Sequence, residues 1–364
     1  MVDAVTGYNQ PDYRLNVNGL DITPKVGPRL IELRLREDRG EKADQLDLTL
    51  DDADGRLALP PTGATISLQL GWAGGLMVDK GTYIVDEVEH GGAPDRLQIR
   101  ARSANMGRGL RLRDSQSWHE STLGAIVGEV ASRNGLPAHI DPQLAARVVA
   151  HADQTDESDL NFLTRLAGQN DAVCTVKGGA LVFLRTGGST NAAGKQLGTV
   201  HIVRRLGDQH RYHAAERTSY KGVRANWYNP RSARRESVVA GGGDEGDDDS
   251  DSDVKELKDV YASEDDAARA ASSEMQRIDR GQATFSLTLA LGQPALMPQS
   301  PVSVSGFKKE IDGTAWLVKS VEHSLDERGF TTGVEMELPG SGAFSAQAEL
   351  GDDEGDEGDE GDED

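Results

Sequence analysis

The first hundred residues alternate between apolar and polar side chains, and this two-residue period constrains the fold more than any other feature. In "YRLNVNGLDIT" the apolar residues Tyr13, Leu15 and Val17 occupy every second position. Successive side chains of a β-strand point to opposite faces, so this period is typical of a strand with one buried face. The dipeptide Asn18-Gly19 follows directly and favours a tight turn. The chain therefore begins with a predicted strand and turn.

The same pattern continues through five further segments. In "LIELRLRE" one face carries Ile31, Leu33 and Leu35, and the other carries Glu32, Arg34 and Arg36. Comparable runs span residues 45–50, 64–72, 81–90 and 95–103, and Gly, Pro or Asp sets each of them off. Six short strands with turn residues between them predict an antiparallel sheet or barrel.

The middle of the chain has helical periodicity instead. In "STLGAIVGEVASRNGLP" (121–137) apolar residues recur at helical spacing, Ser121 or Thr122 can cap the start, and Asn134-Gly135 can end the helix. "QTDESDLNFLTRLAGQND" (154–171) predicts a second short helix, capped by Asp156 or Ser158. Its apolar side consists of Leu160, Phe162, Leu163, Leu166 and Ala167.

A hairpin is predicted directly after the second helix. "AVCTVKGGALVFLR" (172–185) contains two apolar runs around a turn at Lys177-Gly178-Gly179. We expect the helix to pack as a lid on this small sheet. The middle third is therefore a small domain that contains both helices and strands.

The last third returns to strands after one alanine-rich helix. "SEDDAARAASSEMQRIDRG" (263–281) predicts a helix that Ser263 caps, with Asp266 three positions on, and that Gly281 ends. Four strands are then predicted within residues 283–291, 301–307, 314–325 and 329–338. At 364 residues, the chain is long enough for two or three such domains.

Two acidic runs carry most of the net charge. Residues 241–253 hold seven acidic residues and residues 349–364 hold eleven, and removing these eighteen charges from the formal net charge of −22 leaves −4. Such runs bury too little apolar surface to fold, so a disordered loop and a disordered tail are expected. The remaining body offers no basic stripe, which argues against nucleic-acid binding.

The sequence does not predict a catalytic, cofactor-binding or metal-binding residue. Cys174 is the one cysteine, and we interpret it as a small core residue. His210 and His213 lack nearby acids or thiols, and "GGSTNAAGK" (187–195) matches a phosphate loop only loosely. "DDDSDSD" (247–253) lacks the glycine and the final glutamate of a calcium loop. No secretory signal and no membrane-spanning run is expected, so the chain is interpreted as soluble.

Three separated motifs resemble the phage late control gene D family, the baseplate hubs of contractile tails. The first is "Q-x-x-E-S-D-L-N-F-L-x-R-L-A" (154–167), and that family shares it with the N-terminal part of type VI secretion VgrG spikes. The others are "LALGQPALMPQSPVSVSGF" (289–307) and "IDGTAWLVKSVEHSLDERGFTTGVEME" (311–337), with Trp316, His323 and Thr331-Thr332 in the usual places. Pro298-Gln299-Ser300 departs from the Pro-Gly that family members often have there.

The resemblance implies a mainly β fold with two tube-type antiparallel β-barrel modules and a small central α+β domain. The expected division is an N-terminal extension (1–12), a first module (13–105), a central domain (106–205), a second module (206–340) and an acidic tail (341–364). The second module would include the acidic loop (240–254) and the helix (263–281). On this interpretation His323 is a structural strand residue.

The resemblance also implies a function without catalysis. Three chains with two modules each would form a ring that joins the sixfold tail tube to a threefold spike, in a virion made in a bacterial cytoplasm. The implied partners are two further copies, the spike, tube and tape-measure proteins and other baseplate proteins. No cofactor, no specific nucleic-acid contact and no membrane anchor is implied.

Several alternatives stay open at this point. The hub could carry an added peptidoglycan hydrolase, or it could serve a bacteriocin-like or type VI secretion-like particle. A third hypothesis, a DNA-binding regulator, conflicts with the charge of the body.

We expect a neutral or negative wall around the passage of a hub ring, because such a wall does not bind a polyanion. The two candidate sets for this wall or for the outer surface are Glu32, Arg34 and Arg36, and Asp86, Glu87 and Glu89.

Overall fold

The computed structural model describes residues 10–40, 43–103, 108–188, 196–214, 220–241 and 253–340. The predicted acidic tail lies outside these ranges, and so does the acidic loop except for Ala240, Gly241, Asp253 and Val254 at its ends. Most of the predicted N-terminal extension also lies outside them, because the description begins at Gln10.

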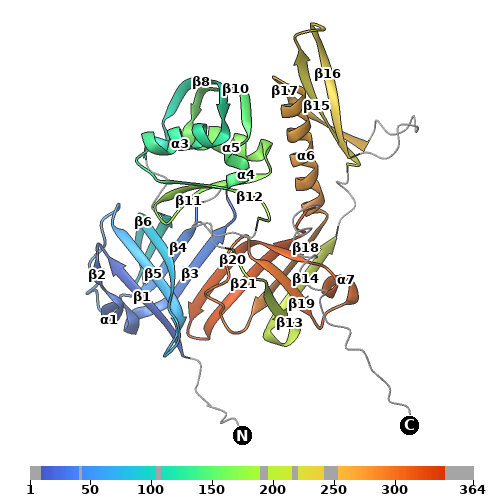
Figure 1. The fold of residues 1–364 in the computed structure, drawn as a ribbon. Helices are drawn as coiled ribbons and strands as arrows, with labels where there is room; N and C mark the ends of the chain where they lie inside the picture. The colour runs from blue at the N-terminus through green and yellow to red at the C-terminus, as the bar shows by residue number, and fades with distance from the viewer. Residues whose placement is uncertain are drawn as a thin grey trace, which may run out of the picture.

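One 13-stranded sheet forms the base of the molecule (Figure 1). Its main path runs in the order β14 (Gly207–Ala214), β18 (Ala283–Leu289), β21 (Gly329–Glu337), β20 (Trp316–Asp326), β3 (Leu30–Asp38), β4 (Gln45–Asp51), β7 (Arg96–Ser103), β6 (Val78–Gly91), β5 (Thr65–Trp72), β1 (Pro11–Val17) and β2 (Leu20–Asp21). β19 (Pro301–Ser305) joins through β20, and β13 (Val200–Val203) pairs with β19 in parallel. The predicted strands of the first and last thirds are all present, which confirms the mainly β fold.

The pairing of β20 with β3 joins the two predicted modules into one sheet. The two strands are antiparallel, and their register runs from Ser320 opposite Asp38 to Asp326 opposite Glu32. The two halves of the sheet curl separately on either side of this pair (Figure 1). The molecule therefore contains two half-barrels that share a continuous sheet.

Alternation explains the core of the first half-barrel. Leu33 and Leu35 of β3 and Leu46 of β4 are completely buried. Arg34 and Arg36, which alternate with the buried residues of β3, are exposed. The Asn18-Gly19 turn joins β1 to β2 with φ angles of 49° and 83°, the positive values that a tight hairpin turn needs. The short helices α1 (Thr23–Val26) and η1 (Gly27–Arg29) then lead into β3.

A second core fills the other half-barrel. Its largest buried side chains, Phe285 of β18 and Trp316 of β20, have ring centroids 5.4 Å apart. The short helices η2 (Arg204–Leu206) and α7 (Lys309–Asp312) connect strands of this half. At the boundary with the first half, the ring centroids of Trp72 of β5 and Phe330 of β21 lie 5.4 Å apart. The indole N–H of Trp72 donates a hydrogen bond to the carbonyl of Gly292.

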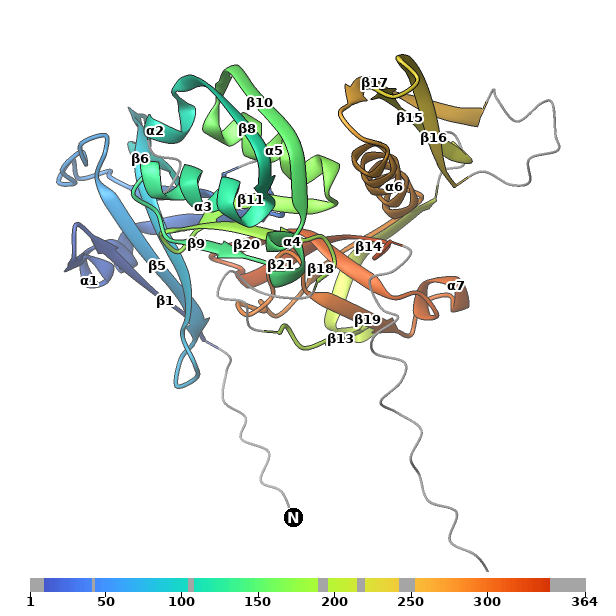
Figure 2. The same ribbon diagram turned by 45° about the horizontal axis from the view of Figure 1, so that its top comes forward.

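The central domain stands on one side of the sheet (Figures 1 and 2). It contains α2 (Arg108–Arg111), β8 (Arg113–Thr122), α3 (Leu123–Arg133), β9 (Ala138–Ile140), α4 (Pro142–Ala145), β10 (Val148–Ser158), α5 (Asp159–Gln169), β11 (Ala172–Lys177) and β12 (Ala180–Arg185). Thr122 caps α3 and Ser158 caps α5, each by accepting a hydrogen bond from a backbone N–H. The hairpin turns at the predicted glycines, and α5 packs against it.

A separate arm rises beside the central domain (Figure 1). Its sheet has the order β16 (Arg234–Gly241), β15 (Gly222–Asn229) and β17 (Val254–Tyr261), and α6 (Glu264–Gly281) lies along one face of it. Ser263 caps α6 as predicted. Small buried residues, Ala267 and Ala271 of α6 and Val223 and Ala225 of β15, let the helix lie close to the strands.

Two segments lie apart from the modules to which the sequence-based division assigned them. β13 falls within the expected central domain but pairs with β19 of the second half-barrel. Residues 222–261 fall within the expected second module but form the arm sheet with its own small core. Pattern within a strand does not reveal its partner, because pairing depends on which strands meet in space.

Candidate functional site: the charged sheet face and the buried junction

One face of the joined sheet is polar and spans both half-barrels. A row of register partners crosses five neighbouring strands, from Ser324 of β20 through Arg34 of β3, Asp47 of β4 and Arg100 of β7 to Glu87 of β6. Because residues in register point to the same side of a sheet, these side chains share a face. The structure thereby brings the two charged sets on β3 and β6 onto one surface, which we call the charged sheet face.

The charges of this face are paired. Arg34 lies 2.6 Å from Glu32 and 3.6 Å from Glu322 across the β20–β3 junction. Arg100 lies 3.2 Å from Asp47 and 2.5 Å from Glu87. Further pairs are Arg102–Asp86 at 3.1 Å, Arg36–Asp38 at 3.1 Å and Lys319–Glu335 at 2.9 Å.

Each of these pairs adds little stability, because water screens exposed charges. Their collective effect is a surface that is densely charged but nearly balanced in sign. The paired charges leave no continuous basic stripe on this face that could bind a polyanion.

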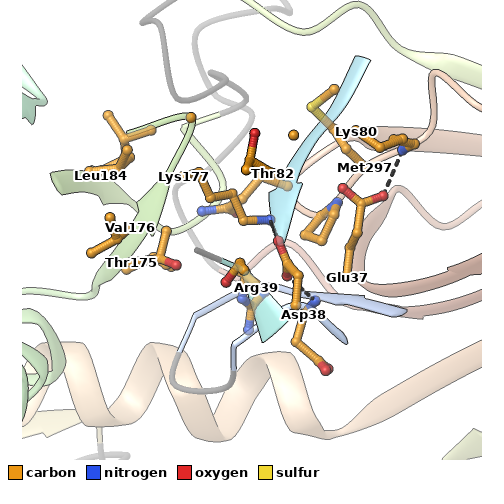
Figure 3. A pocket seen from close by; sticks show the side chains of 18 of the residues that line it. Glu37, Asp38, Arg39, Lys80, Thr82, Thr175, Val176, Lys177, Leu184 and Met297 are labelled. Atoms are coloured by element: carbon orange, nitrogen blue, oxygen red, sulfur yellow. Dashed lines mark hydrogen bonds and ion pairs between the residues drawn. The ribbon is translucent and has the colours of Figure 1, made fainter. Parts of the chain in front are cut away.

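A cavity of about 500 Å³ lies behind the sheet, where three parts of the chain meet. Its walls come from β3 and β6 of the first half-barrel, from the β11–β12 hairpin, and from the loop around Met297 (Figure 3). Two lysines enter this region from different sides. Lys80 Nζ lies 2.6 Å from Glu37 Oε2, and Lys177 Nζ lies 3.1 Å from Asp44 Oδ2.

Glu37 lies on the buried face of β3, the face that also carries Leu33 and Leu35. Burial raises the pKa of its carboxyl, but the ammonium of Lys80, together with His323 and Lys177, outweighs burial and holds this pKa well below its usual range. The pair therefore stays charged inside the protein. This pair was not predicted from the sequence, although an acidic residue in phase with Ile31, Leu33 and Leu35 was a usable signal.

His323 lies beside this pair and is completely buried. Its Nδ1 lies 2.9 Å from Thr332 Oγ1, and its Nε2 lies 3.4 Å from Glu37 Oε2 without the geometry of a hydrogen bond. Burial, together with the charge of Lys80, lowers the pKa of His323. The ring is therefore neutral near neutral pH, and it fills a position between strands β20, β21 and β3.

A second buried ionic cluster ties the arm to the rest of the molecule. Arg280, near the end of α6, donates hydrogen bonds of 2.9 and 2.5 Å to Asp171, which precedes β11. Arg280 Nε also lies 3.4 Å from Glu337 of β21, which in turn lies 2.6 Å from Arg39. One guanidinium thus connects the arm, the central domain and the joined sheet.

The residues that the sequence analysis considered for chemistry do not come together. Cys174 is buried in the central core, and burial raises the pKa of its thiol to about 12. His210 and His213 are exposed on β14. The described residues contain no group of three or more His, Cys, Asp or Glu side chains arranged to hold a metal ion. The acidic run 247–253, apart from Asp253, and most of the loop 187–195 lie outside the described ranges.

No helix in the described part of the chain combines the length and the apolar composition that crossing a membrane requires.

The fold is similar to that of a phage tail protein and of a type VI secretion system component. A 43 kDa tail protein of prophage MuSo2 from Shewanella oneidensis aligns with 91% of this chain and 99% of its own length, at a TM-score of 0.64 and 16% identity. An Escherichia coli component of the type VI secretion system aligns with 90% of this chain and 77% of its own, at a TM-score of 0.57 and 14% identity.

Sequence similarity identifies the family. A model of the phage tail baseplate hub family (GPD) matches residues 41–329. The probable baseplate hub protein of Escherichia phage 186 is 40% identical over 93% of this chain and 95% of its own. The chain belongs to the phage tail baseplate hub family, which confirms the expected resemblance. It is a structural component of a phage tail.

Proposed function

We propose that three copies of this chain form a ring of six half-barrels, with the charged sheet face lining a central passage. The ring would join a sixfold tail tube on one side to a threefold spike on the other. The observation that carries the proposal is the row from Ser324 to Glu87, because it makes one uninterrupted polar wall out of two modules. Two modules in each of three copies match a sixfold tube.

The open edge of the sheet supports assembly through further copies. β14 pairs only with β18 among the described strands, and seven of its eight residues are exposed. An exposed edge strand offers free backbone N–H and C=O groups to another chain. We propose that this edge contacts the neighbouring copy in the ring.

The balanced charges of the face support its role as a wall. DNA or a tape-measure protein must pass through a tail, and a wall without a basic stripe does not bind a polyanion. The proposed partners are therefore the tube, spike and tape-measure proteins and other baseplate proteins. We also propose that the hub itself has no catalytic activity.

Mass photometry of the purified full-length chain tests the ring directly. Three chains of 39.0 kDa give a particle of about 117 kDa. A particle that stays at the mass of one chain across the micromolar concentration range contradicts the proposal.

A zymogram with bacterial cell walls tests the proposed absence of hydrolase activity. A zone of clearing would contradict that part of the proposal.

Cysteine labelling tests which face lines the passage. Glu322→Cys places a thiol on the charged sheet face, and Arg231→Cys places one on the exposed tip of the arm. The native Cys174 is buried and gives little background. In the trimer of Glu322→Cys, the new thiol should react with a small maleimide but only slowly with a large branched polyethylene glycol maleimide. The new thiol of Arg231→Cys should react with both reagents. Equal access of the large reagent to both positions contradicts the assignment.

A further inference from the structure

Two histidines face each other on the outer strands of the central domain. β8 and β10 form an antiparallel pair, and His119 and His151 are direct register partners in it. Both side chains are exposed, and their rings stack with centroids 4.6 Å apart at an angle of 30°. They lie 32 positions apart in the sequence, so only strand pairing brings them together.

The nitrogen atoms of the pair converge. Nδ1 of His151 lies 3.0 Å from Nδ1 of His119. In a metal-free protein, one of these atoms must donate a proton to the other. The two nitrogens lie close enough for one ion to replace that proton once the exposed rings turn out of their stacked arrangement.

A carboxylate fixes which nitrogen of His151 is free. Asp153 Oδ2 lies 2.8 Å from His151 Nε2, and Ser117 Oγ donates to Asp153 Oδ1 over 2.5 Å. A carboxylate is ordinarily ionised at neutral pH, and in that form its oxygens only accept hydrogen bonds. His151 Nε2 must then be the donor, which leaves Nδ1 with a free lone pair. A carboxylate that holds the second nitrogen of a metal-binding histidine is a recurring feature of such sites.

We propose that Nδ1 of His119 and Nδ1 of His151 bind one divalent transition-metal ion, with Asp153 as the positioning residue. At Zn–N distances of ~2.0–2.1 Å, two nitrogens on a tetrahedral ion lie about 3.3 Å apart. The two nitrogens therefore need to separate by only a few tenths of an ångström, and the two exposed rings must turn so that the ion lies in the plane of each. His119 would carry its proton on Nε2 in the metal-bound form, and water would complete the coordination, since the described residues supply no third ligand here.

The ligand chemistry determines which ions should bind. Imidazole nitrogen suits Zn²⁺, Ni²⁺ and Cu²⁺, whereas Mg²⁺ and Ca²⁺ prefer oxygen ligands. Affinity should increase from Co²⁺ through Ni²⁺ to Cu²⁺ and be lower again for Zn²⁺. The acidic runs of the chain offer many carboxylates, so excess Mg²⁺ is needed to occupy them during the measurement.

Isothermal titration of the full-length chain with ZnCl₂ and NiCl₂ in excess MgCl₂ tests the site. We expect one ion per chain, loss of this binding in His119→Ala and in His151→Ala, and affinity about 10–100-fold weaker in Asp153→Asn. His139→Ala removes another exposed histidine of the same domain and should bind as the unmodified chain does. Both ligand residues are exposed, so the variants should fold, which circular dichroism can verify.

Electron paramagnetic resonance of the Cu²⁺ form provides an independent measurement. Nitrogen splitting from two imidazoles should be present in the unmodified chain and absent from the double variant, in which His119→Ala and His151→Ala are combined. If the double variant binds Zn²⁺ and Ni²⁺ as tightly as the unmodified chain, the pair is only a hydrogen-bonded contact and the proposal is wrong. These measurements do not depend on the oligomeric state, so the site can fail without affecting the proposed ring.

Discussion

Lys80 and Glu37 form an ion pair of 2.6 Å with side chains that are only 2% and 9% exposed. The residues belong to β6 and β3. They line the cavity where the first half-barrel meets the β11–β12 hairpin and the loop around Met297. Removing one member of such a pair leaves an uncompensated charge in a medium that solvates it poorly.

We therefore expect Lys80→Met to lower the free energy of unfolding by about 3–5 kcal/mol in urea titrations at neutral pH. Arg34→Met removes an exposed pairing residue from the neighbouring face and should change it by about 0–1 kcal/mol. The double variant Lys80→Met with Glu37→Met should recover much of the loss, because the buried charge is gone. Equal stability of Lys80→Met and the unmodified chain would falsify the assigned role.

The same cluster predicts how stability depends on pH. The pKa of His323 is lowered in the folded protein, so on acidification below about 6.5 the unfolded chain takes up a proton that the folded chain does not. The free energy of unfolding should therefore fall as the pH drops through this range. The pKa of Glu37 is also lowered, so its contribution is present above its ordinary value of 4.5 and is lost as the pH falls below it.

The comparison of His323→Asn with the unmodified chain isolates the first step. Urea unfolding at a series of pH values should show a shallower slope between about pH 7 and pH 5 for the variant. His139→Asn, at an exposed position, should retain the original slope. Identical slopes for all three proteins would mean that the pKa of His323 does not change on folding.

Arg280 should hold the arm against the central domain. Its guanidinium is 5% exposed and lies against Asp171 and Glu337, so Arg280→Ala leaves Asp171 without this partner and Glu337 with Arg39 alone. We expect a loss of about 3–5 kcal/mol and faster proteolytic cleavage near residues 222–281. Arg277→Ala, three residues earlier at a side chain that is 65% exposed, should cost at most about 1 kcal/mol. Unchanged proteolysis of the arm in Arg280→Ala would contradict this role.

Two glycine substitutions should have opposite effects. A Cβ on Gly292 would lie 2.5 Å from the ring of Phe330, so Gly292→Ala should destabilise the chain by about 1–3 kcal/mol. Gly128 lies within α3, where an added Cβ would meet no neighbouring group within 4 Å, and Gly128→Ala should stabilise by about 0.5–1 kcal/mol. Differential scanning calorimetry on both variants checks the signs. A stabilising Gly292→Ala would mean that the Trp72–Phe330 contact tolerates displacement.

Much of the local structure could be predicted from the sequence. The two-residue period of β3 and the caps Thr122, Ser158 and Ser263 are short-range signals, because side-chain direction and orphan N–H groups depend on neighbouring residues alone. The family resemblance rested on three such local motifs. These signals yielded the strands, the main helices and the class of protein.

The tertiary structure decided what these elements do together. The β20–β3 pair joins residues as far apart in the sequence as Asp326 and Glu32, and the row from Ser324 to Glu87 crosses both half-barrels only because of that pairing. The burial of Glu37 against Lys80 and the meeting of His119 with His151 likewise follow from register and packing. A sequence specifies which face each side chain takes within its own strand. It does not state which strand lies alongside, because that depends on the free energy of assembling the whole core.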